Sequence, residues 1–186
     1  VSSNAANAET PGYVRETSVQ VQMATGTGVQ TNGVNRTLDE YIQSQLRTET
    51  SGATYASTRA SFLSNLQSIY GDPSSSSTLE ANFNALTSAL QALSTSPDSQ
   101  SARIGVINAA QSMAQQLNAT SQGIQSLRNS AELGLTNSVS MANNALAQIA
   151  NINKQLQGSV GQTAATAAML DQRDQYITQL SQLMDV

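Results

Sequence analysis

Residues 98–157 read DSQSARIGVINAAQSMAQQLNATSQGIQSLRNSAELGLTNSVSMANNALAQIANINKQLQ. Apolar or small side chains recur along this stretch in steps of three and four, which keeps them on one face of a helix. The positions are Val106, Ala110, Met113, Leu117, Thr120, Ile124, Leu127 and Ala131, then Leu135 and Val139, then Ala142, Leu146, Ile149, Asn153 and Leu156. A helix of this length would extend about 85 to 90 Å at ~1.5 Å per residue. We therefore expect a rod or an elongated bundle, and a bend or a change of packing partner at the re-phasing near Leu135, beside Gly134.

The composition excludes several classes of function. The 186 residues include no Cys, His or Trp, and only 11% of them are charged, for a formal net charge of −4. Without Cys and His, the common zinc, copper and iron ligand sets and the Ser/His or Cys/His nucleophile pairs cannot form. We therefore predict no metal, no cofactor, no catalytic residue and no enzyme activity. The lack of clustered Lys and Arg argues against nucleic acid, and no apolar run approaches the ~18 residues needed for membrane insertion.

Residues 1–36 predict a connecting segment with a turn and a β-hairpin. Pro11 stops any incoming helix, and Gly12 permits a turn. Apolar and Gln residues alternate from Val19 to Met23, which is typical of a strand with one dry face. Gly26-Thr27-Gly28 can turn the chain, and Val29 to Val34 can return as the partner strand.

Residues 37–186 predict a helical core domain, with helices at about 38–70, 78–94, 98–157 and 164–185. Thr37 to Glu40 and Ser77 to Glu80 have the form of capping boxes, and Asp98 is placed to cap the long helix. Short loops imply antiparallel neighbours. The expected fold is mainly α: an elongated antiparallel helical bundle with one long helix and a small N-terminal β-hairpin.

The apolar stripes indicate how these helices pack. The cleanest stripe repeats at four, three, four and three residues, at Leu79, Phe83, Leu86, Leu90 and Leu93. The last helix carries Met169, Leu170, Ile177, Leu180 and Met184 on one side. The long helix has many small or polar positions in its seam and few charges beside it, so packing within the chain is favoured over a two-stranded coiled coil.

Two groups of charged residues are candidates for interactions. Asp171, Arg173 and Asp174 could form a catalytic cluster, but on a helix such residues more often form a solvated or paired face. We expect a structural ion pair that links Arg173 to a neighbouring helix. Arg36, Asp39 and Arg47 admit the same interpretation, with contact between subunits as the sharper alternative.

Several motifs resemble those of a known family. The stretch that contains Asn4, Asn7 and Thr10-Pro11-Gly12-Tyr13 resembles the signature of axial proteins of the bacterial flagellum. Later blocks are similar to the FlgK family of hook-associated proteins, and they recur in order across the chain. They comprise Gly28-Val29, Val34, Arg36, Asp39, Tyr41-Ile42, Gln45-Leu46-Arg47, Leu93-Ser94, Pro97-Asp98, Ala102-Arg103 and Leu170-Asp171-Gln172-Arg173-Asp174. Ala5 departs from the pattern, because the family has a larger aliphatic residue there.

The resemblance implies a role as well as a fold. The full protein would be a structural axial component of the flagellum that joins hook to filament by subunit packing. It would be exported through the flagellar channel to an extracellular location. Its partners would be copies of itself, the hook protein and hook-associated protein 3. The family's leading helix would precede Val1, and its outer β-rich domain and closing helices would follow Val186. Other axial proteins, such as flagellin or hook-associated protein 3, and a secreted helical adhesin stay open as alternatives.

We expect this 186-residue chain in isolation to be a monomeric helical particle that does not assemble, because the resemblance implies that the polymerising helices are missing. Sedimentation velocity measures this directly. Stable rings formed by the isolated chain would contradict the expectation.

Overall fold

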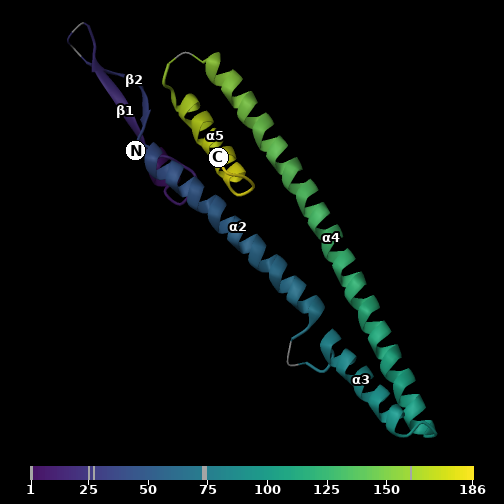
Figure 1. Cartoon of the computed structure of the whole chain (residues 1–186). Helices are drawn as coiled ribbons and strands as arrows, with labels where there is room; N and C mark the ends of the chain where they lie inside the picture. Colours follow the sequence, from purple (N-terminus) through teal and green to yellow (C-terminus); the bar gives the residue numbers. More distant parts are fainter. Residues whose placement is uncertain (1, 25, 27, 73–74, 160) are drawn as a thin grey trace. The chain divides into compact units, whose positions relative to one another are not determined.

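The fold is mainly α with a small β-hairpin at the front (Figure 1). The computed structural model describes residues 2–24, 26, 28–72, 75–159 and 161–186. In chain order the elements are α1 (Ser2–Ala6), β1 (Glu16–Gln22), β2 (Val29–Arg36), α2 (Glu40–Tyr70), α3 (Leu79–Thr95), α4 (Gln100–Gln157) and α5 (Ala164–Ser181). The predicted class, with its one long helix and N-terminal hairpin, is confirmed. The short helix α1 was not predicted.

The chain forms two compact units. One comprises residues 1–56 and 136–186, and the other comprises residues 57–135. Both α2 and α4 contribute to each unit. The boundary on α4 falls between Leu135 and Thr136, where the apolar stripe is re-phased, and the helix is continuous through Gly134. The separate domains expected at 1–36 and 37–186 stay a prediction.

In the first unit, β1 and β2 pair antiparallel, with Glu16 opposite Arg36 and Gln22 opposite Val29. An irregularity between Val19 and Gln20 places Gly33 opposite Val19. A Cβ at Gly33 would lie 2.7 Å from the carbonyl oxygen of Gln162, and the neighbouring Val34 N–H donates to that oxygen at 2.9 Å. Glycine therefore lets β2 lie directly against the segment that precedes α5.

The prediction that one face of this hairpin is buried is wrong. Val19, Val21 and Met23 are 40%, 41% and 43% exposed, because the helices do not cover that face of the ribbon. Thr27, in the predicted turn, lies outside the described residues.

The caps of α2 and α3 differ from the predicted ones. Thr37 does not cap α2, because the helix begins at Glu40; the Thr37 N–H donates to the Arg15 carbonyl and extends the hairpin ladder. Asp39 caps instead, since its Oδ1 accepts from the N–H groups of Tyr41 and Ile42 at 3.1 Å each. The cap of α3 is Thr78, one residue later than expected, and it accepts from Ala81 N–H.

Asp98 does not cap α4. The hydroxyl of Ser99 accepts from the N–H of Ala102 at 3.3 Å, whereas Asp98 approaches Arg103 at 3.8 Å in an exposed position. At all three helix starts the sequence locates the helix to within two residues. The residue whose side chain reaches the free N–H groups depends on the entry path of the backbone.

The core of the first unit is small. Its buried apolar side chains are Val14, Ala145, Ile152, Ala167 and Leu180. On α4 the buried positions are Ala145 and Ile152, between the half-buried Ala142, Ile149 and Leu156. The predicted seam positions Leu146 and Asn153 are exposed. The buried residues are their neighbours Ala145 and Ile152, one position earlier on the helix. Met184, predicted to pack, is also exposed.

In the second unit, the apolar stripe of α3 is less buried than the sequence predicted. Leu79, Leu86 and Leu93 are half-buried, whereas Phe83 and Leu90 are exposed. On α4, Gly123 faces α2 so closely that an added Cβ would lie 3.0 Å from Ile69 Cγ2. A glycine at this position therefore allows the two helices to approach.

The glycines of α4 offer a matched test of this contact. Gly105 has open space around its would-be Cβ, so Gly105→Ala should stabilise the chain by about 0.5–1 kcal/mol through helix propensity. Gly123→Ala should lose that gain because Ile69 must move. Urea unfolding followed by circular dichroism measures both, and equal stabilisation would show that Ile69 does not restrict position 123.

Candidate functional site

Asn4 fastens α1 to the beginning of β1. Its Nδ2 donates to the Glu16 carbonyl at 2.7 Å, and its Oδ1 accepts from the Glu16 N–H at 2.9 Å. The same Oδ1 accepts from the Tyr13 hydroxyl at 2.9 Å. An amide side chain can bond both polar groups of one residue because it offers a donor and an acceptor. Asn4 therefore acts as a paired neighbour to Glu16, as a strand would.

Asn7 and Thr10 hold the turn between these two elements. Asn7 Nδ2 donates to the Ser3 carbonyl at 3.0 Å, and the Thr10 hydroxyl donates to Asn7 Oδ1 at 3.2 Å. The signature residues Asn4, Asn7, Thr10 and Tyr13 thus form one hydrogen-bonded turn. We call it the N-terminal clip.

Pro11 and Gly12 bring the clip against α5. Gly12 has φ of +80°, which favours glycine, and a Cβ there would lie 2.7 Å from Gln175 Cγ. Gln175 Nε2 donates to the Pro11 carbonyl at 3.2 Å. Glycine is therefore required here both for the backbone conformation and for the close approach of α5.

Asp171 of α5 binds both ends of the hairpin segment. Its Oδ2 accepts from the N–H of Val14, before β1, at 3.3 Å. Its Oδ1 accepts from Nε of Arg36, the last residue of β2, at 2.8 Å. The Arg36 Nη2 lies 2.6 Å from the same oxygen. One carboxylate thus joins residues that are far apart in the sequence.

Asp174 lies one turn further along α5 and is surrounded by guanidinium groups. Arg36 Nη2 donates to its Oδ2 at 2.7 Å, and the Nη2 atoms of Arg47 and Arg173 lie 3.8 and 3.7 Å from its Oδ1. Asp171 and Asp174 are each only 6% exposed. We call Arg36, Arg47, Asp171, Arg173 and Asp174 the charge cluster.

The predicted ion pair between Arg173 and a neighbouring helix is wrong. Its ion pair is with Asp174 of its own helix, and the links from α5 to α2 and β2 come from Arg47 and Arg36. Asp171 and Asp174 lie on the buried face of α5. Their carboxylates therefore contact Arg36 of β2 and Arg47 of α2. In the described part of the chain, the Nε atoms of Arg47 and Arg173 are buried without a hydrogen-bond partner.

The charge cluster is built to hold segments together. A buried ion pair contributes little compared with a well-packed apolar pair, but removing one partner typically costs about 3–5 kcal/mol because a charge is left buried and uncompensated. Loss of Asp171 would leave the Val14 N–H without its acceptor and Arg36 with Asp174 alone. Asp39 lies outside the cluster and caps α2. Contact between subunits through Arg36, Asp39 or Arg47 stays a prediction.

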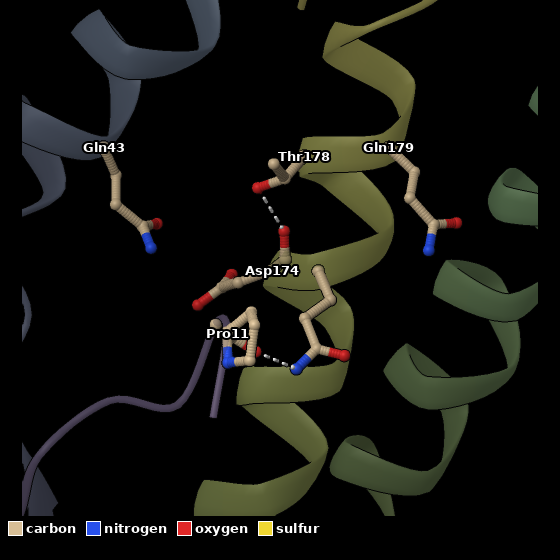
Figure 2. Close-up of a pocket in the computed structure, with 7 residues that line it drawn as sticks. Pro11, Gln43, Asp174, Thr178 and Gln179 are labelled. Atoms are coloured by element: carbon tan, nitrogen blue, oxygen red, sulfur yellow. Dashed lines mark hydrogen bonds between the residues drawn. The ribbon is translucent and has the colours of Figure 1, made fainter. Parts of the chain in front are cut away.

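A cavity of about 310 Å³ lies beside the cluster, between the clip, α2 and α5. Its walls are Pro11, Gly12, Gln43, Asp174, Gln175, Thr178 and Gln179. Figure 2 shows Asp174 directed from α5 toward α2, with the Thr178 hydroxyl bonded to its carbonyl oxygen. The polar groups of the lining include the side-chain amides of Gln43, Gln175 and Gln179 and the hydroxyl of Thr178.

Sequence reasoning missed three residues that complete these contacts: Val14, Gln162 and Gln175. Val14 and Gln162 act through backbone atoms, which leave no mark in the residue type. Gln175 lies four residues after Asp171, so it shares the face of α5 that meets the clip. That spacing was the available signal.

The described residues contain neither a metal-binding group of side chains nor a helix that could span a membrane. No group of three or more His, Cys, Asp or Glu side chains is arranged there to hold a metal ion. None of the helices in that part of the chain is long and apolar enough to cross a membrane.

Comparison with known proteins extends the resemblance. Residues 63–186 match the family model described as "Flagellar hook-associated protein FlgK helical domain". "Flagellar hook-associated protein 1" of Salmonella typhimurium is 30% identical over 196 residues, covering 100% of this chain and 35% of the relative. Proteins of the same name from Escherichia coli and Bacillus subtilis are 29% and 28% identical, each over 198 residues.

These matches place the chain among the axial structural proteins of the bacterial flagellum. It spans 35% of the length of the Salmonella and Escherichia coli relatives, covering 100% of itself in each, and 39% of the Bacillus relative, covering 98% of itself. The chain belongs to the FlgK family of flagellar hook-associated proteins.

Substitution of two glycines with positive φ tests the cost of backbone strain separately from the cost of losing the contact with α5. Gly26 (φ +71°) has nothing within 4 Å of a would-be Cβ, whereas Gly12 faces Gln175. Gly26→Ala should cost about 1–2 kcal/mol of hairpin stability, the usual penalty for Ala in this conformation. Gly12→Ala should cost more, because Gln175 must also leave Pro11. Amide hydrogen exchange of β1 measures both, and equal effects would show that the approach to α5 is unimportant.

Proposed function

We propose that this chain is the helical part of a junction protein that links flagellar hook and filament. The observation that carries the proposal is the match along the whole chain to proteins named flagellar hook-associated protein 1. The mechanism is packing between subunits, with no chemical step. The partners are further copies of the protein, the hook protein and hook-associated protein 3, and assembly follows export to the cell exterior.

The exposed face of α2 supports a role in packing. Tyr41, Ile42 and Leu46 are 78%, 61% and 58% exposed. Gln43 and Arg47, which are half-buried, lie on the other side of the same turns and face the cavity and α5. An apolar face of this kind gains stability when another polypeptide covers it. The three side chains therefore suit a contact within an assembly.

The alternatives make different predictions. Hook-associated protein 3 or flagellin would also be an axial protein, but its loss would leave a different structure at the cell surface. A secreted adhesin would not be needed for filament growth. A strain that lacks the gene for the full-length protein separates the junction role from flagellin and from the adhesin: it should make hooks and shed unpolymerised flagellin. Normal filaments in that strain would refute the junction role.

Complementation with variants of the full-length protein tests the face of α2. Ile42→Asp should leave secretion intact, because the side chain is exposed, but should reduce filament attachment severalfold by placing a charge in an apolar contact. Ser44→Asp, on the same helix and exposed, is the matched control. Filament counts by electron microscopy and swarming diameter give the measurement. If both variants complement equally, this face is not a packing surface.

A further inference from the structure

The N-terminal segment, residues 2–36, is attached to the helices mainly through polar contacts at its base. Val14 is its buried apolar residue, whereas Val19, Val21 and Met23 of the hairpin are exposed. A two-stranded hairpin is at best marginally stable in water by itself. The position of the segment therefore depends on the groups that bind it to α5.

Those groups converge on one residue. Asp171 accepts from the Val14 N–H before β1 and from Arg36 at the end of β2, so it closes the hairpin at its base from outside. Of these two donors, Asp174 accepts a hydrogen bond only from Arg36. Further polar contacts, from the Gln175 amide to the Pro11 carbonyl and from the Val34 N–H to the Gln162 carbonyl, each involve one point of the segment.

We infer that Asp171 is a positioning residue that fastens both ends of the hairpin to α5, so that residues 2–36 dock and undock as one unit while the helices stay folded. The clip moves with this unit, because Asn4 bonds Glu16 at the beginning of β1. A single carboxylate on α5 thus sets the direction of the chain before β1.

The two aspartates of α5 are not equivalent in this arrangement. Loss of Asp174 would leave Arg36 bound to Asp171 through Nε, and Val14 still bonded. Loss of Asp171 would release Val14 and leave Arg36 with Asp174 only. Release of the Val14 end is therefore specific to Asp171, whereas the Arg36 end is weakened by the loss of either aspartate.

Hydrogen exchange followed by mass spectrometry on this 186-residue chain tests the inference. In Asp171→Asn, amides of β1 and β2 should exchange about tenfold to a hundredfold faster, the change expected from weakening a charge-assisted hydrogen bond. Exchange in α3 should not change. Asp185→Asn removes an exposed carboxylate of the same unit and should leave the hairpin rates unaltered.

A second pair of variants covers the case in which Asp171→Asn does not fold. Arg36→Lys keeps the charge but loses the two-point contact with Asp171 and Asp174, so hairpin exchange should accelerate to a smaller extent. In the Arg36→Gln and Asp171→Asn double variant, hairpin exchange should accelerate by less than the product of the two single effects, because the two changes share the Arg36–Asp171 contact although Arg36→Gln also removes the contact with Asp174.

Three outcomes would overturn the inference. Equal acceleration in the hairpin and in α3 would mean that Asp171 stabilises the whole chain. Unchanged hairpin rates in both Asp171→Asn and Arg36→Lys would mean that the hairpin opens without undocking. Additive effects in the double variant would mean that Arg36 and Asp171 act separately.

Discussion

The carboxylate of Asp171 is the contact on which the placement of the N-terminal segment depends. It takes one hydrogen bond from backbone and one from a guanidinium group, both from segments remote in sequence. Burial makes the arrangement demanding, because a charge withdrawn from water must be compensated by fixed partners. Arg36 provides that compensation and at the same time satisfies Asp174. The geometry of α5, with residues 171 and 174 on one face, makes the double contact possible.

The family signature has a physical interpretation in this arrangement. Asn4, Asn7, Thr10 and Tyr13 form a hydrogen-bonded turn, and Pro11 and Gly12 carry that turn against α5. The later block, Leu170 to Asp174, supplies the carboxylates on the receiving side. The two motifs at opposite ends of the chain thus belong to one structure.

The apolar core is small for a chain of this length. In the first unit several contacts involve alanine, such as Ala145 and Ala167, which bury little surface. Large side chains such as Tyr41 and Ile42 remain exposed. A subunit that completes its packing by contact with other polypeptides would have this distribution, because the stabilisation comes partly from assembly.

The sequence by itself determined the helical class, the long helix predicted at 98–157 and the hairpin, because periodicity and turn residues act locally. Its motifs indicated the family through their resemblance to known proteins. It also singled out Asp171, Asp174 and Arg36. Only the tertiary structure decided which arginine meets which aspartate, which residue caps each helix, and which phase of the α4 seam is buried. Those outcomes depend on backbone groups such as Val14 N–H and on distances between remote segments. Neither is encoded in the spacing of residues along one helix.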